Sequence, residues 1–209
     1  MTAAGEPTLT FWYELASTYS YPAAFRIERA AAAAGVRVLW RPFLLGPIFR
    51  DQGMDTSPFI TYPAKGRYMW RDVARLCAAA GVPWRQPSEM PRNSLHAARI
   101  ALLGQDQSWG PAFSRAVYRA NFADDADIAD PDVLAGLLTG LDLPAAELIA
   151  RAREPATKDR LKAQTAEAAA RGIFGSPSYT VSDELFWGGD RLDQALKWAR
   201  APGLAAQDP

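Results

Sequence analysis

The sequence is poor in the residues that make disulfides and metal sites. Its 209 residues include one cysteine, Cys77, and one histidine, His96. A single cysteine excludes an intramolecular disulfide, and the two residues cannot supply the cluster of ligands that a structural zinc site needs. We therefore expect no metal. We expect Cys77 to be a buried apolar side chain and His96 to be structural.

The chain also lacks an excess of charge and a long hydrophobic run. Lysine plus arginine number 23, as do aspartate plus glutamate. This balance gives no basic surface for nucleic acid or anionic membranes. No stretch approaches the roughly 18 apolar residues that span a bilayer, and the N-terminal segment MTAAGEPTLTFWY has no basic region followed by an apolar run. We expect a cytoplasmic protein that binds neither nucleic acid nor membranes.

The N-terminal part of the sequence predicts a strand, a helix and a second strand. TLTFWYEL (8–15) alternates as a strand does, and an alanine-rich helix follows from about Tyr19 to Ala34, closed by Gly35. VRVLWRPFL (36–44) indicates the second strand. Short connections make this a βαβ unit, which predicts a parallel pair and a right-handed crossover. The residues expected on one face of the first strand are Leu9, Phe11, Tyr13 and Leu15.

The middle of the chain has a different pattern. GPIFRDQGMDTSPFITYPAKG (46–66) is rich in Gly and Pro, and predicts an ordered loop with Phe49, Phe59, Ile60 and Tyr62 to bury. Helical periodicity then indicates segments near 65–80, 93–103, 111–122, 131–138 and 144–153. The buried face expected for the first of these helices consists of Met69, Val73, Leu76 and Ala80. Asp130 followed by Pro131 predicts a helix cap.

The C-terminal part predicts a helix, two strands and a helix. A helix over 158–171 is followed by the short strands SYTV and ELFW around a tight Ser182-Asp183 turn, and Asp190 is expected to start the last helix. Without the helical middle, the order is βαβαββα, which is that of a thioredoxin fold. We therefore predict an α/β protein, a thioredoxin fold with an inserted all-helical domain. Residues 1–45 and 155–209 would form the thioredoxin-like domain and 46–154 the inserted helical domain.

Four motifs follow in this order along the chain. Ser17-Thr18-Tyr19-Ser20 stands where thioredoxin-fold oxidoreductases carry Cys-x-x-Cys, and it precedes YPAKGRY (62–68), GIFGSPSYTV (172–181) and FWGGDRLDQAL (186–196). With them the chain resembles the kappa-class glutathione transferases and the related 2-hydroxychromene-2-carboxylate isomerases, whose fold is DsbA-like. Thr18 departs from the proline usual after the active serine, and Thr56 from a frequent asparagine.

The resemblance implies glutathione as cofactor and Ser17 as the catalytic residue. A serine hydroxyl and a helix N-terminus both favour a thiolate, whose free thiol has a pKa of about 8.5. The resemblance also implies that Lys65 helps to bind glutathione and that the Ser176-Pro177 bond is cis. Ser176 would then pair through its backbone with the cysteinyl part of glutathione. Gly189 and Asp190 would contact its γ-glutamyl end.

The residues by themselves leave other roles open. Ser17 and Ser20 could be helix caps only, Lys65 a solvated surface residue and Asp190 a simple N-cap. Arg191 could be a structural ion-pair partner. The aromatic residues that could line an acceptor pocket, or belong to the core instead, are Trp12, Phe49, Tyr68 and Trp187.

The function that the resemblance implies is glutathione-dependent cis-trans isomerisation of the 2-hydroxychromene-2-carboxylate isomerase type, on a small aromatic substrate. A kappa-type glutathione S-transferase is the first alternative. A non-catalytic thioredoxin-fold module that binds peptides beside Pro177 is the alternative of another class. A thiol-disulfide oxidoreductase is disfavoured, because Ser17 and Ser20 replace both sulfurs. The same analogy implies a homodimer.

Overall fold

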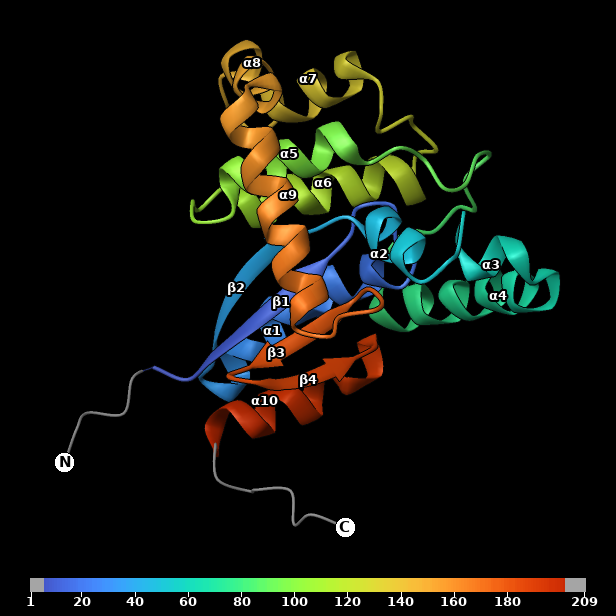
Figure 1. The fold of residues 1–209 in the computed structure, drawn as a ribbon, viewed down its shortest axis with the longest axis vertical. Coiled ribbons are helices and arrows are strands. Elements are labelled where there is room, and N and C mark those ends of the chain that lie inside the picture. Colours follow the sequence, from blue (N-terminus) through green and yellow to red (C-terminus); the bar gives the residue numbers. More distant parts are fainter. Residues whose placement is uncertain (1–5, 202–209) are drawn as a thin grey trace.

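A four-stranded sheet at the centre of the molecule contains strands from both the N-terminal and the C-terminal parts of the sequence. The computed structural model describes residues 6–201, so the first five residues of the N-terminal segment lie outside it (Figure 1). The strands are β1 (Thr8–Tyr13), β2 (Arg37–Pro42), β3 (Ser178–Val181) and β4 (Glu184–Trp187), and their order in the sheet is β2-β1-β3-β4. β1 pairs with β2 in parallel and with β3 antiparallel. The predicted parallel pair and C-terminal hairpin are confirmed.

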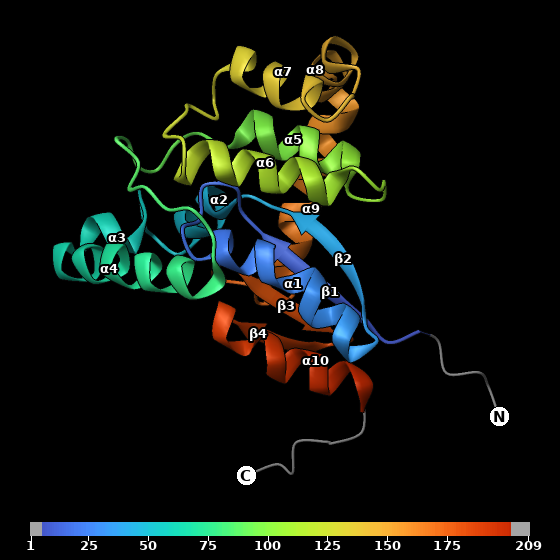
Figure 2. The same cartoon turned by 180° about the vertical axis from the view of Figure 1, so that it is seen from behind.

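Helices cover both faces of this sheet. α1 (Ser20–Ala34) and α10 (Leu192–Arg200) lie on one face, and α9 (Pro155–Ala170) lies on the other (Figures 1 and 2). Alternation along β1 explains the two packed layers. Phe11 lies within 5.0 Å of Trp40 and 5.6 Å of Tyr179, measured between ring centroids. Trp12 points to the opposite face and packs with Phe43.

The helical part of the chain lies along the β2 edge and beside the sheet. α5 (Leu95–Gly104), α6 (Gly110–Phe122), α7 (Pro131–Thr139) and α8 (Ala145–Arg153) stack beyond β2, while α4 (Pro63–Ala80) projects sideways (Figures 1 and 2). The helices predicted here are all present, and Asp130 caps α7 by accepting a hydrogen bond from the Asp132 N–H. No helix within residues 6–201 is long and apolar enough to cross a membrane.

Three predictions for the segments after β2 are wrong. Residues 46–66 are not one loop, because they contain α2 (Leu45–Asp51) and the one-turn α3 (Pro58–Thr61), which Ser57 caps. Ile60 and Tyr62, expected to be buried, are exposed. On α4 the buried face is Met69, Val73 and Cys77, whereas Leu76 is exposed. The α4 helix packs over a narrow stripe, so a shift by one residue moves a side chain from core to solvent.

The topology confirms the predicted thioredoxin fold with helices inserted after β2. The insertion begins after the second strand and the chain re-enters the sheet at β3. α1 ends at Ala34 and is closed by Gly35, whose φ of 64° is left-handed, as the sequence predicts. This topology matters for function because it brings the carboxyl end of β1, the start of α1 and the loop before β3 together beside α4.

Candidate active site

All six residues predicted to act on or bind glutathione line one cleft. The cleft has a volume of about 1780 Å³ and is lined by the start of α1, α2, α3, α4 and the segments that flank β3 and β4. The six residues are Ser17, Lys65, Ser176, Pro177, Gly189 and Asp190. They come from separate parts of the chain, so folding alone brings them together. Their binding roles stay predictions.

Ser17 lies in the loop of residues 14–19, which we call the serine loop. α1 begins at Ser20, and no side chain caps it at the preceding residue, Tyr19. The Ser17 side chain lines the cleft, whereas Ser20 is fully buried. The positive end of a 15-residue helix therefore lies beside the Ser17 hydroxyl. Ser20 is not an N-cap, because its hydroxyl bonds to the side chains of Ser17 and Ser176.

The segment before β3 brings Ser176 against the serine loop. Its bond to Pro177 is cis, as predicted. The Ser176 carbonyl accepts a hydrogen bond from the Ser17 hydroxyl at 3.0 Å, and the Ser176 N–H has no hydrogen-bond partner within residues 6–201. The prediction gave a role only to the backbone of Ser176. The Ser176 hydroxyl also accepts a hydrogen bond from the Glu14 N–H at 2.9 Å and lies 2.6 Å from the Ser20 hydroxyl.

Lys65 lies in the first turn of α4 and is exposed on the cleft wall. Its Nζ is 4.8 Å from the centroid of the Tyr62 ring. The next residue, Gly66, explains why α4 can pack on α3. A Cβ at Gly66 would come within 2.4 Å of the Phe59 carbonyl oxygen, so only glycine allows this approach. The Lys-Gly pair thus sets the position of the lysine through helix packing.

Two side chains of the serine loop contact the same helix. The Thr18 hydroxyl donates to Met69 Sδ at 3.2 Å, and the Tyr19 hydroxyl donates to Asp72 at 3.2 Å. Thr18, the residue that departs from the expected proline, therefore packs against α4. Because Lys65 lies on this helix, these contacts hold the loop and the lysine in one unit.

Gly189 and Asp190 lie between β4 and α10. Gly189–Arg191 form one turn of 3₁₀-helix, and α10 begins only at Leu192. Asp190 therefore does not start the last α-helix and does not cap it. Its carboxylate is exposed and pairs with Arg191 at 3.3 Å, which places Arg191 in an ion pair. The backbone turns sharply before them, at Gly188, where φ is 109°.

Three of the four aromatic residues proposed for an acceptor pocket line the cleft. They are Phe49, Tyr68 and Trp187, and Thr56 also lines the cleft. Trp12 does not line it, because it is buried against Phe43 on the face of the sheet opposite to Phe11. Trp187 is exposed and its ring centroid lies 4.8 Å from that of Phe174. The cleft therefore has aromatic side chains on several of the elements that line it.

Sequence reasoning missed Glu14, the first residue of the serine loop. Its carboxylate accepts hydrogen bonds from the Ala16 N–H at 2.9 Å and from the Ser94 hydroxyl. Burial raises the pKa of Glu14 to about 7, although these two hydrogen bonds act in the other direction. A charged residue directly after an apolar strand was the available signal. The carboxyl joins the serine loop to the segment before α5.

Cys77 and His96 lie away from the cleft lining. Cys77 is fully buried, and burial raises the pKa of its thiol to about 12. Burial, followed by the nearby Arg99, lowers the pKa of His96. In the part of the chain described by the structure, no group of three potential ligands among His, Cys, Asp and Glu is placed to hold a metal ion.

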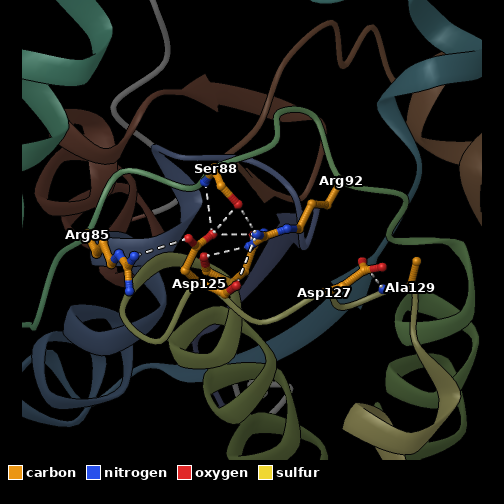
Figure 3. A network of polar contacts seen from close by, with 7 residues as sticks. Arg85, Ser88, Arg92, Asp125, Asp127 and Ala129 are labelled. Carbon is orange, nitrogen blue, oxygen red and sulfur yellow. Dashed lines mark hydrogen bonds and ion pairs between the residues drawn. The ribbon is translucent and has the colours of Figure 1, made fainter.

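A polar network anchors the segment that carries Ser94. Arg92, which is nearly buried, donates to the backbone carbonyl oxygens of Asn121 and Asp125 at 3.1 Å and pairs with the Asp125 carboxylate (Figure 3). The Ser88 N–H and hydroxyl also donate to Asp125, and Arg85 approaches it from the solvent side. A hydrogen bond from the Ser88 N–H, followed by that from Arg92, lowers the pKa of Asp125 to about 2.

We expect Arg92→Ala to lower the free energy of unfolding by about 2 kcal/mol, because it removes charged hydrogen bonds from two backbone carbonyls. The stabilisation from Asp125 is present above its ordinary pKa of 3.8 and is lost as the pH falls toward about 2, so the variant should also unfold at a higher pH than the wild type. Urea and acid unfolding curves measure both effects. Arg85→Ala is the matched control, since Arg85 pairs with Asp125 from an exposed position. Equal losses in the two variants would contradict the prediction.

The chain is similar to enzymes of two kinds. It is 28% identical over 186 residues to a 2-hydroxychromene-2-carboxylate isomerase from Sphingobium xenophagum, which covers 89% of this chain and 94% of the relative. It is 24% identical over 206 residues to glutathione S-transferase kappa 2 of Caenorhabditis elegans, with 92% and 91% covered. The solved structure of a 2-hydroxychromene-2-carboxylate isomerase superposes with a TM-score of 0.83 at 22% identity, over 93% of this chain and 95% of that one.

The family is shown by a match that spans nearly the whole described chain. The model of the DsbA-like thioredoxin domain matches residues 8–198, from the first residue of β1 into α10. The match agrees with the sheet order and with the helices inserted between β2 and β3. This chain belongs to the DsbA-like thioredoxin domain family.

Proposed function

We propose that this protein is a glutathione-dependent isomerase of the 2-hydroxychromene-2-carboxylate type, with Ser17 as its catalytic residue. One observation carries the proposal. The Ser17 hydroxyl lies at a helix N-terminus in the same cleft as Lys65 and as the free N–H of Ser176. A serine with no cysteine beside it is suited to stabilise a thiolate that another molecule brings.

The residues of the cleft fit a short anionic peptide. The unpartnered Ser176 N–H and its carbonyl can pair with an extended peptide as an added strand. Lys65 can bind a carboxylate, and Gly189 and Asp190 offer backbone N–H groups and a carboxylate to an amino-acid end. When bound, glutathione supplies the nucleophilic thiol and is regenerated at the end of an isomerisation.

The protein groups have separate tasks in this proposal. The Ser17 hydroxyl and the positive end of α1 stabilise negative charge on sulfur. The aromatic residues that line the cleft, Phe49, Tyr68 and Trp187, can contact a planar acceptor. Arg50, which also lines the cleft, can hold the carboxylate of that acceptor.

A kappa-type transferase is the second candidate, and the similarity to the nematode transferase favours it. The two reactions need the same thiolate and differ in the acceptor. Conversion of 2-hydroxychromene-2-carboxylate, with no net consumption of glutathione, would support the isomerase. Intact glutathione binding without that conversion would remove the isomerase and leave the transferase, whose assay is conjugation of glutathione to an aromatic electrophile.

Binding of glutathione to the cleft is tested by calorimetric titration with reduced glutathione. We expect saturable binding that Lys65→Ala weakens roughly tenfold, the loss of one charged hydrogen bond. Lys197→Ala is the matched control, because Lys197 is exposed on α10 and does not line the cleft. No binding at millimolar glutathione would refute the proposal and favour a non-catalytic peptide-binding module.

A further inference from the structure

Three serine hydroxyls from two distant parts of the chain are in contact at the base of the cleft. The Ser17 Oγ lies 3.1 Å from the Ser20 Oγ, which lies 2.6 Å from the Ser176 Oγ. Backbone groups stand at both ends. The Glu14 N–H donates to the Ser176 Oγ at 2.9 Å, and the Ser176 carbonyl accepts from the Ser17 Oγ at 3.0 Å.

The number of protons available gives this chain of hydrogen bonds one direction. A hydroxyl has a single proton to donate. A carbonyl can only accept, so Ser17 donates its proton to the Ser176 carbonyl. Ser20 must then donate to Ser17, and Ser176 must donate to Ser20. The Glu14 N–H donates into the hydrogen-bond chain at Ser176, so the protons of Ser176 and Ser20 both point toward Ser17, and the Ser17 proton is the last in the series.

A chain of hydrogen bonds that all run in one direction strengthens the last donor. Each hydroxyl that accepts a hydrogen bond becomes a better donor to the next, and the effect is larger where water does not compete. Ser20 is fully buried, whereas Ser17 and Ser176 are half-buried and line the cleft. Polarisation therefore runs through a buried hydroxyl and ends on one that a ligand can reach.

The last acceptor of the chain, the Ser176 carbonyl, is also an acceptor that an added peptide strand would use. An N–H donor at this carbonyl leaves the Ser17 proton free to rotate about the Cβ–Oγ bond toward the cleft. Ser20 continues to donate to Ser17 during this rotation, because that bond uses the oxygen and not the proton of Ser17.

We propose that Ser20 and Ser176 are positioning residues for Ser17, and that their hydroxyls orient and polarise the Ser17 hydroxyl as a donor to an anionic sulfur. This inference rests on the proposed use of glutathione. It assigns a role to the Ser176 side chain in addition to its backbone. It also gives the buried Ser20 a task other than capping α1.

The test in the glutathione complex uses Ser20→Ala and Ser176→Ala. The pKa of the bound thiol is measured from the ultraviolet absorbance of its thiolate during a pH titration. We expect each variant to raise this pKa by about 0.5 to 1, because a weakened hydrogen bond loses a fraction of its free energy. Affinity for S-methylglutathione, which has no thiol proton, should stay within about twofold, since the peptide contacts remain. An unchanged thiol pKa in both variants would overturn the inference.

One further measurement and one control variant separate the effect of the hydrogen-bond chain from other effects of the substitutions. In the free protein, Ser20→Ala should shift the Glu14 amide proton resonance upfield, because a Ser176 hydroxyl without its acceptor accepts less strongly. An unchanged amide resonance would contradict the inferred chain of hydrogen bonds, whether or not the protein binds glutathione. Ser114→Ala is the matched control, because Ser114 is equally buried and hydrogen-bonds Tyr13 outside the cleft lining. Failure of the wild type to bind both glutathione and S-methylglutathione would refute the proposed function, and with it the inference.

Discussion

Replacing Ser17 with alanine is expected to lower kcat for glutathione-dependent turnover by about 10²- to 10³-fold, the usual effect of removing one donor to a developing anion. The structure places the Ser17 hydroxyl on the cleft, at the positive end of α1. Alanine removes the only group of this residue that can donate to sulfur. The pKa of the bound thiol should also rise toward its free value of about 8.5.

Steady-state kinetics and the thiolate titration check this prediction together. Ser17→Thr is the matched variant, because it keeps a hydroxyl and should retain more of the rate than alanine. A catalytic role predicts loss of kcat with little change in affinity for S-methylglutathione. Turnover by Ser17→Ala close to that of the wild type would show that Ser17 is not the catalytic residue.

Replacing Glu14 with glutamine is expected to change how stability depends on pH. Burial raises the pKa of Glu14 from 4.5 to about 7. A carboxyl whose pKa is raised by folding stabilises the native state fully below pH 4.5, and this contribution is lost as the pH rises to about 7. The shift corresponds to about 3 kcal/mol. Glutamine keeps the size of the side chain and cannot ionise.

The measurement is the free energy of unfolding of both proteins in urea at a series of pH values. The difference between Glu14→Gln and the wild type should move in favour of the variant by about 3 kcal/mol between pH 4.5 and 8. Other titrating groups cancel, because both proteins carry them. Glu184→Gln controls for loss of a carboxylate, since Glu184 is exposed on β4. A difference independent of pH would contradict the buried position of Glu14.

The site shows why some residues could be predicted from motifs and others could not. Ser17, Lys65 and Pro177 each stand in a short pattern with a recognisable spacing, and the structure places all three on one cleft. Glu14 and the hydroxyl of Ser176 carry no such pattern. Their contacts join residues 162 positions apart in the chain. Local sequence does not report which distant group a polar side chain will meet.

Helix faces were predictable only where packing follows the period of the helix. On α4, Met69 and Val73 were predicted as buried, but Cys77 takes the position assigned to Leu76. Ile60 on α3 and Tyr62 directly after it are exposed, while the backbone of α3 at Phe59 lies against Gly66 of α4. Periodicity states which residues share a face, and the partner decides how wide the buried stripe is.

The sequence by itself determined the order of the strands and of the longer helices, though not the short α2 and α3, together with the thioredoxin-type connection and the serine in place of the first cysteine. These features depend on residue spacing and on chemistry within a few positions. Only the tertiary structure decided that Ser176 contacts both Ser17 and Ser20, that Glu14 is buried against Ser94, and that Trp12 lies outside the cleft. These features arise from contacts between distant segments and from the direction of the pleat in β1. Burial and hydrogen bonding at such contacts are properties of the packed chain, which no local pattern contains.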